Sequence, residues 1–158
     1  YGHSVRDGVM ELNLLRSSKW PDYNADQGHQ EFTYAFAPHR GTLVDSSVQS
    51  DAAQLNREPW RFDGYAAKAL SLPISVEGQG VSIEAVKRAE RSDELIVRIV
   101  ETRGRHASAT VRLSKGCGFK RVSFTNAIEW TDDGVLSLKD GEGSLALHPF
   151  QIVTLRLS

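Results

Sequence analysis

The stretch LIVRIVETRGRHASATVRL, residues 95–113, decides the fold that this sequence predicts. Residues 95–102 form the most apolar strand-like run of the chain, and Gly104 follows as a turn signal. From Ala107 to Leu113, small or apolar residues alternate with Ser, Thr and Arg. A period of two is typical of a strand with one buried face. The stretch therefore predicts two strands, residues 95–102 and 107–113, separated by a turn at Gly104.

Further short strands are predicted on both sides of this pair, and Gly- and Asp-rich turns separate them. Strands at this spacing, without the alternating helices that a parallel sheet needs, favour an all-β antiparallel β-sandwich. Pro73 makes the first of these strands an edge strand or an interrupted one. The predicted strands cover residues 70–76, 81–89, 119–130, 135–138, 144–147 and 150–157.

One short helix is predicted near residues 44–57, where apolar residues recur at spacings of three and four. Asp45 or Ser46 is expected to cap its start, and Pro59 to stop it. Trp60 and Phe62 follow as a short strand or anchor. We expect residues 1–158 to form a single β-sandwich domain.

Composition excludes several functional classes. The chain has 158 residues, 40% of them hydrophobic and 25% charged, as in ordinary globular proteins. Its net charge of −1 gives no electrostatic reason to expect binding to nucleic acid or to a membrane surface. The single cysteine, Cys117, suits a reducing compartment, and we expect a cytoplasmic location. Because Tyr1 is not a start methionine, we expect the chain to be part of a longer protein.

The candidate functional segment is a polar loop, residues 16–30, between two predicted strands at 9–15 and 31–37. A loop of this length in a compact domain is more often functional or disordered than neutral. In the second strand, Phe32, Tyr34 and Phe36 share one face, which suits packing against a second layer.

The loop residues allow both functional and purely structural interpretations. Asp22 and Asp26 could act as the acid and base of a glycosidase, but turn formation by their side chains is the favoured interpretation. Arg16 could hold sugar hydroxyls or a carboxylate, or it could be an ordinary surface arginine. Trp20, Tyr23 and Trp130 could stack on sugar rings, or they could simply pack in a core.

No sequence motif indicates a catalytic nucleophile or a metal site. The five histidines show neither the i, i+4 nor the HxH spacing of metal ligands. The sequence also contains no GxSxG motif and no Gly-rich phosphate loop. His39 ends a predicted strand, and we interpret it as structural.

A series of short words spread over nearly the whole chain resembles the carboxy-terminal β-region of family 38 glycoside hydrolases, the class II α-mannosidases. The resemblance is closest to the bacterial and the cytosolic or vacuolar branch. The words are Val5-Arg6-Asp7-Gly8, Leu14-Leu15-Arg16-Ser17, Trp20-Pro21-Asp22, Ala25-Asp26-Gln27-Gly28, Phe32-Thr33-Tyr34-Ala35 and Pro38-His39, followed by Gln54-Leu55-Asn56, Val86-Lys87-Arg88-Ala89-Glu90, Leu95-Ile96-Val97-Arg98, Glu101 and the run from Pro149 to Leu157.

This resemblance implies a function for the longer protein rather than for the fragment alone. It implies retaining hydrolysis of terminal α-linked mannose, with the nucleophile and a zinc ion, or another divalent metal, in a catalytic domain that this chain does not contain. It also implies a catalytically inactive fragment that supplies a wall of the substrate pocket. Arg16 matches an arginine that reaches toward the sugar in relatives, and Asp22, Asp26 and His29 are expected at the pocket rim.

The expected partners follow from the same resemblance. They are a mannose-containing oligosaccharide and the missing catalytic and helical domains, without nucleic acid or membrane. Self-association into a homo-oligomer is left open. Two alternatives remain at this point, an independent carbohydrate-binding module and a purely structural β-sandwich that buries a face against its neighbours.

Overall fold

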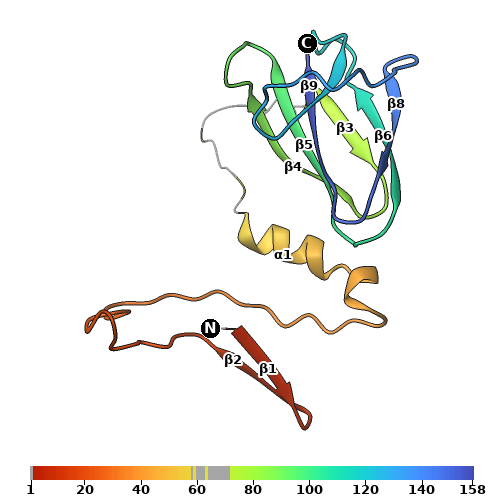
Figure 1. Cartoon of the computed structure of the whole chain (residues 1–158). Coiled ribbons are helices and arrows are strands. Elements are labelled where there is room, and N and C mark those ends of the chain that lie inside the picture. Colours follow the sequence, from red (N-terminus) through yellow and green to blue (C-terminus); the bar gives the residue numbers. More distant parts are fainter. Residues whose placement is uncertain (1, 58, 60–62, 64–71) are drawn as a thin grey trace. The chain divides into compact units, whose positions relative to one another are not determined.

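The computed structural model describes residues 2–57, 59, 63 and 72–158 (Figure 1). Its contacts divide the chain into an N-terminal unit, Tyr1–Arg40, and a sandwich unit, Gly41–Ser158. Each unit is described separately below. That the whole chain forms a single domain stays a prediction, and the expected anchor at Trp60 and Phe62 lies outside the described residues.

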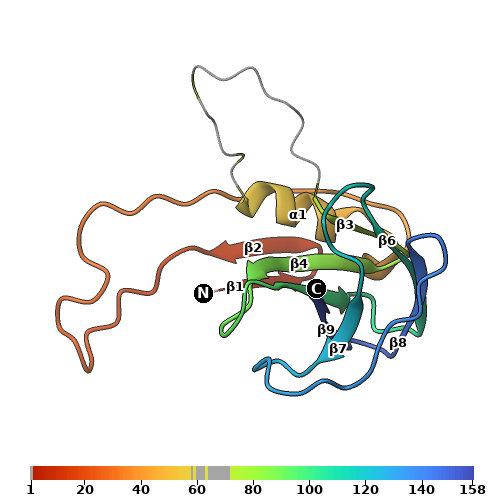
Figure 2. The same ribbon diagram turned by 90° about the horizontal axis from the view of Figure 1, so that it is seen from above.

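The sandwich unit confirms the predicted all-β class. One antiparallel sheet has the strand order β3-β6-β8, and the other has the order β4-β5-β9-β7. Figures 1 and 2 show the two sheets as separate layers of this unit. The strands are β3 (Ile74–Glu77), β4 (Val81–Arg88), β5 (Leu95–Glu101), β6 (Ala107–Leu113), β7 (Val122–Thr125), β8 (Glu142–Leu147) and β9 (Ile152–Leu157).

The core lies between the sheets because the inward-facing residues of both are apolar. Val97 and Ile99 on β5 and Leu155 on β9 are completely buried. Val111 on β6 meets them from the other sheet as part of the same cluster. On β9, Val153, Leu155 and Leu157 face the core and are buried, while Ile152 is 63% exposed; Thr154 is buried as well.

Two strand predictions hold only in part. Strand β3 is an edge strand, as Pro73 predicted, and it begins directly after this proline. The strand expected at 135–138 is reduced to a single bridge between Ser123 and Val135. Leu136 is nevertheless buried in the core, so the segment contributes packing without forming a ladder.

The predicted helix is present in two pieces, the 3-10 helix η1 (Leu43–Asp45) and the helix α1 (Val48–Asn56). Ser47 occupies the N-cap position, one residue after the expected Ser46, but the Ser46 hydroxyl accepts the backbone N–H of Val48, the first residue of α1, over 3.3 Å. The Ser47 hydroxyl donates to the Asp51 side chain, one turn further along α1, instead of accepting a backbone N–H. No residue of η1 or α1 is fully buried, and Val44 and Val48 are half-buried.

The N-terminal unit begins with an antiparallel hairpin of β1 (Gly2–Arg6) and β2 (Val9–Asn13). Asp7 and Gly8 form its turn, and both have positive φ angles, 52° and 78°. An Asp-Gly pair with two positive φ angles matches the twist of a tight hairpin. Strand β2 begins at Val9, as predicted, but it ends at Asn13 rather than at residue 15.

The second strand predicted in this unit, residues 31–37, is wrong. The segment has no strand geometry, and Phe32, Tyr34 and Phe36 are all exposed. A strand needs a neighbouring strand, because the backbone hydrogen bonds of a sheet form between strands. An alternating sequence pattern does not provide that neighbour. No helix among the described residues has the length and apolarity needed to cross a membrane.

The inward side of β9 provides a test of the sandwich. Replacing Leu155 with Ala should lower the free energy of unfolding by about 2–5 kcal/mol because it leaves a cavity between the sheets. Ile152→Ala, on the exposed side of the same strand, is the matched control and should cost about 0.5 kcal/mol or less. Urea unfolding of the 158-residue chain measures both variants. Equal losses for the two would contradict the assignment of the inward face.

Candidate functional site

The loop that holds the predicted site residues is closed on itself at its base. The Ser17 backbone N–H donates to Asp26 Oδ2 over 3.2 Å, and the Ser17 hydroxyl donates to the Ala25 carbonyl over 3.3 Å. Compact loops whose ends meet in this way are frequently functional. The closure places Ser17, the residue that follows Arg16, in contact with Asp26, the first residue of the Asp26-Gln27-Gly28 segment.

The two aspartates of the loop form turns. Asp22 Oδ1 accepts the Asn24 backbone N–H over 2.9 Å, and this contact is an Asx turn. Asp26 has a φ of +60° and uses its carboxylate at the loop base. These contacts agree with the favoured interpretation of turn formation. They do not place the two carboxylates on either side of a reacting bond, as a glycosidase acid and base require.

The aromatic residues of the loop are exposed. Trp20 is 84% exposed and Tyr23 is 73% exposed, with the Lys19 ammonium 5.9 Å from the centre of the Tyr23 ring. Trp130, in the sandwich unit, is 66% exposed, and the Arg91 guanidinium lies 4.8 Å from its ring centre. The alternative that these rings pack in a core is therefore wrong within the described residues.

Arg16 and His29 are also exposed and lie at the two ends of the loop. In the structure, Asp26 lies at the base of the loop beside Ser17, and Asp22 lies in a turn within the loop. His29 is exposed near the end of the loop. Their roles toward a sugar stay predictions.

Residues 2–40 bury no side chain, although they carry many large apolar groups. Monomeric soluble proteins rarely leave this much apolar side-chain surface exposed to water. The residues concerned are Val5, Val9, Met10, Leu12, Leu14, Leu15, Trp20, Tyr23, Phe32, Tyr34 and Phe36.

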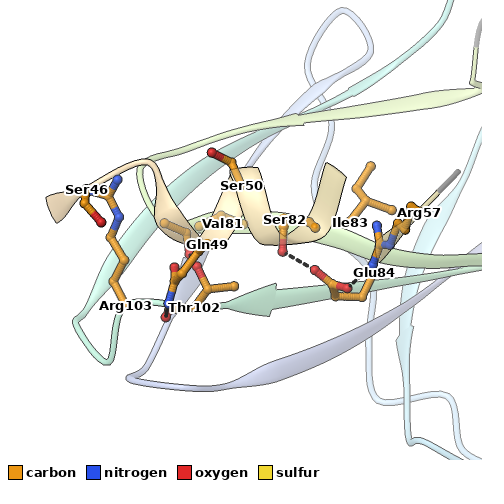
Figure 3. A pocket seen from close by; sticks show the side chains of 12 residues that line it. Ser46, Gln49, Ser50, Arg57, Val81, Ser82, Ile83, Glu84, Thr102 and Arg103 are labelled. Carbon is orange, nitrogen blue, oxygen red and sulfur yellow. Dashed lines mark hydrogen bonds and ion pairs between the residues drawn. The ribbon is translucent and has the colours of Figure 1, made fainter. Parts of the chain in front are cut away.

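A pocket of about 330 Å³ lies in the sandwich unit between α1 and strand β4 (Figure 3). Its polar side chains bind mainly one another. Arg57 pairs with Glu84 at 2.7 Å, and the Ser82 hydroxyl donates to the same carboxylate. The hydrogen bond from the Ser82 hydroxyl and the charge and hydrogen bond of the Arg57 guanidinium hold the pKa of Glu84 below its ordinary value, although partial burial of the carboxylate acts in the opposite direction. Since β4 is an edge strand, the pocket is best explained as the gap beneath a helix that covers a sheet edge.

Two buried carboxylates, which the sequence did not single out as site residues, organise the sandwich unit. Glu101, at the end of β5, is only 1% exposed. It accepts the backbone N–H groups of Arg103, Gly104, Arg105 and Phe150 over 2.8 to 3.2 Å. Burial alone would raise the pKa of Glu101, but these four donors outweigh it and lower the pKa. Glu101 lies on the same face of β5 as Val97 and Ile99. A carboxylate at a position where the sequence pattern places apolar, inward-facing residues was the signal that could have identified Glu101 as a buried residue.

Glu129, in the loop after β7, has a left-handed backbone with φ +64°. Its carboxylate lies 2.8 Å from Lys87 Nζ and accepts the Glu90 backbone N–H over 2.9 Å. The hydrogen bond from Lys87 is the main reason why the pKa of Glu129 is lowered, with the Glu90 N–H adding to it against burial. The Glu129 carboxylate therefore ties this loop to β4 through Lys87, and the Glu129 backbone carbonyl ties it to β9 by accepting a hydrogen bond from Arg156.

The described residues contain no group of three or more His, Cys, Asp or Glu side chains that could hold a metal ion. His106 and His148 lie edge to face with ring centres 5.1 Å apart, and no third ligand joins them among the described residues. The side chains of the described residues, 2–57, 59, 63 and 72–158, therefore do not form a zinc site.

Comparison with known proteins relates the whole chain to one enzyme family. A family profile described as the glycosyl hydrolases family 38 C-terminal beta sandwich domain matches residues 80–155. Alpha-mannosidase 2C1 of Homo sapiens is 34% identical over 99% of this chain, and the protein of the same name from Mus musculus is 35% identical over 99%. Alpha-mannosidase G of Dictyostelium discoideum is 29% identical over 99% of the chain. The chain spans only 16% of the length of the two mammalian relatives and 15% of the third.

Glu101 predicts a pH dependence of stability. Because its pKa is lower in the folded chain than its ordinary value of 4.5, the stability it contributes should be complete above that value. This stability should be lost as the pH falls from there through the folded-state pKa. Urea unfolding between neutral pH and pH 3 should show a smaller acid loss for Glu101→Gln than for the unaltered chain, and lower stability of the variant at neutral pH.

Glu77→Gln is the matched control, because the Glu77 side chain is 66% exposed on edge strand β3. It should leave the acid profile close to that of the unaltered chain. An acid profile that is the same with Glu or Gln at position 101 would contradict the role given to the four backbone donors.

Proposed function

Because residues 80–155 belong to the C-terminal β-sandwich domain of glycosyl hydrolase family 38, we propose that the chain is the C-terminal part of an α-mannosidase. In this proposal the longer enzyme hydrolyses terminal α-linked mannose with retention of configuration. The 158-residue chain supplies a wall of the substrate pocket and structural support, and it is inactive alone. The similarity of 99% of the chain to proteins named α-mannosidases carries this proposal.

The chemistry of the reaction is placed in the part of the relatives that this chain does not cover. Retaining glycosidases need two carboxyl groups on either side of the scissile bond, whereas Asp22 and Asp26 form turns. A zinc ion or another divalent metal, bound in the catalytic domain, would help to hold the sugar hydroxyls. The resemblance to the cytosolic branch favours a cytoplasmic enzyme.

Arg16 is the residue of this chain that we assign to substrate binding. Its guanidinium can donate several hydrogen bonds in a fixed plane, which suits neighbouring hydroxyls of one sugar ring. The loop closure between Ser17 and Asp26 supports the assignment, because it fixes the backbone next to Arg16. Asp22, Asp26 and His29 would shape the rim of the same pocket.

The exposed apolar residues of the N-terminal unit support the second part of the proposal, the structural role. A unit without buried side chains gains little stability from its own packing, and a two-stranded hairpin is marginal alone. We expect the catalytic and helical domains of the longer enzyme to cover this surface.

An independent carbohydrate-binding module is the second candidate function. The exposure of Trp20 and Tyr23, 84% and 73%, favours it, since flat aromatic rings can stack on the apolar faces of sugars. In this case the isolated chain would bind sugar without the catalytic domain.

The Arg16 assignment predicts a kinetic defect. In the longer enzyme, Arg16→Ala should lower kcat/KM for an α-mannoside by about 10- to 100-fold, the usual effect of losing hydrogen bonds from a charged donor. Metal content and thermal stability should stay unchanged. Arg6→Ala, in the hairpin of the same unit where the side chain is 92% exposed, is the control and should retain full activity. Unchanged kinetics for Arg16→Ala would remove its role.

The two candidate functions differ in what the isolated chain should do. If it is only a pocket wall, calorimetric titration of the 158-residue chain with a mannose oligosaccharide should give no heat of binding. A saturable signal that disappears in Trp20→Ala but persists in Arg16→Ala would instead favour the carbohydrate-binding module.

A further inference from the structure

The loop after β7, residues 126–133, turns two large apolar side chains away from the sandwich unit. Ile128 is 57% exposed and Trp130 is 66% exposed. Glu129, the residue between them, points the other way, since its side chain is only 4% exposed. Burial in the core therefore does not explain why position 130 is a tryptophan.

Contacts from three strands of one sheet hold the backbone of this loop. Lys87 on β4 binds the Glu129 carboxylate over 2.8 Å, and Arg156 on β9 donates to the Glu129 carbonyl over 2.6 Å. Arg98 on β5 donates to the Ala127 carbonyl over 3.0 Å. The chain that leads into Trp130 is thus fixed to the sheet.

Trp130 is also fixed from within the loop. Its backbone N–H donates to Asn126 Oδ1 over 2.9 Å, and the Asn126 N–H donates to the Thr131 hydroxyl over 3.1 Å. Glu129 holds a left-handed backbone with φ +64°, which is costly for a residue other than glycine. A ring whose backbone is ordered in advance loses little conformational entropy when a ligand stacks on it.

A second loop brings a polar side chain next to the ring. The hairpin between β4 and β5, residues 89–94, lies against the Trp130 loop because the Glu90 N–H donates to the Glu129 carboxylate over 2.9 Å. From this hairpin, the Arg91 guanidinium lies 4.8 Å from the centre of the Trp130 ring. Arg91 is itself exposed. A flat apolar ring and a planar set of hydrogen-bond donors therefore lie side by side on the surface.

We propose that Trp130 and Arg91 form a sugar-binding platform on the sandwich unit. The apolar face of a hexose ring stacks on the indole, and the guanidinium donates hydrogen bonds to hydroxyls at the edge of that sugar. The choice of a mannose oligosaccharide as the ligand rests on the proposed function of the longer enzyme. Since Trp130 and Arg91 both belong to the sandwich unit, binding should not require the loop of residues 16–30.

The surroundings of the ring favour a sugar over a protein partner. The core of a protein interface is a continuous apolar surface. The two loops at this platform instead consist mainly of small and polar residues, and Ile128 is the other large apolar residue in them. Such a surface suits one sugar ring with hydroxyl groups around it.

The 158-residue chain, labelled with nitrogen-15, provides a direct test. It has three tryptophan indole N–H signals, from Trp20, Trp60 and Trp130, which single Trp→Phe substitutions assign. A mannose oligosaccharide should shift the Trp130 signal saturably, with a dissociation constant of about 1 mM, as one stacked ring and a few exposed hydrogen bonds permit. The same shift should occur in Trp20→Ala.

Calorimetric titration of variants identifies the side chains responsible. Trp130→Ala should abolish the weak binding signal, and Arg91→Ala should weaken binding by about two- to five-fold, in line with an exposed cation beside a ring. Arg88→Ala is the matched control, because Arg88 is next to the same hairpin, 74% exposed and paired with Asp93. It should bind like the unaltered chain. Urea unfolding should give nearly equal stabilities, since all three side chains are exposed.

A Trp130 signal that stays in place at about ten times the expected dissociation constant would overturn the inference. Equal binding with Trp or Ala at position 130 would also overturn it. If, in addition, a thiol reagent labels Trp130→Cys in the isolated chain but not in the longer enzyme, the ring belongs to a contact between domains. These results would leave a kinetic defect of Arg16→Ala, and thus the proposed function, intact. Normal kinetics of Arg16→Ala with a shifting Trp130 signal would remove the pocket role of Arg16 and keep the platform.

Discussion

The four hydrogen bonds that the backbone donates to Glu101 are the constraint on which the sandwich unit most depends. A charged carboxylate that is 1% exposed is costly unless donors replace the water it loses. Here the donors come from the turn after β5 and from Phe150 before β9. The Glu101 side chain therefore holds together the turn after β5 and the turn before β9, although Glu101 and Phe150 are 49 residues apart in the sequence. The helical segment of η1 and α1 contacts the same turn after β5, because Gln49 donates to the Thr102 carbonyl.

The two units differ in how they use their apolar residues. In the sandwich unit, the inward residues of both sheets meet in a single cluster that includes Ile99, Val111 and Leu155. In the N-terminal unit, comparable residues such as Leu12, Phe36 and Trp20 remain exposed. Since the apolar surface is what drives folding, the sandwich unit contains its own source of stability. The N-terminal unit has no such cluster, since none of residues 2–40 is buried.

Sequence reasoning succeeded where local pattern and burial coincide. The alternation of residues 107–113 predicted the inward face of β6, where Ala109 and Val111 are buried, and Pro73 predicted the edge strand β3. It failed for residues 31–37, because a strand needs a partner that a local pattern cannot provide. The ion pair of Asp45 with Arg105 was also beyond its reach, since 60 residues separate the two. The resemblance pointed to the family whose C-terminal beta sandwich profile matches residues 80–155, whereas the roles of Arg16, Asp22, Asp26 and His29 toward a sugar stay predictions.

We propose that the loop of residues 16–30 forms part of a mannose pocket in a longer enzyme. Hydrogen–deuterium exchange of that enzyme, with and without a competitive mannose-like inhibitor, tests it most directly. We predict slower exchange of the backbone amides of this loop when the inhibitor is bound, with no change in β6 and β8 as internal references. Exchange in the loop that is identical with and without the inhibitor would contradict the claim.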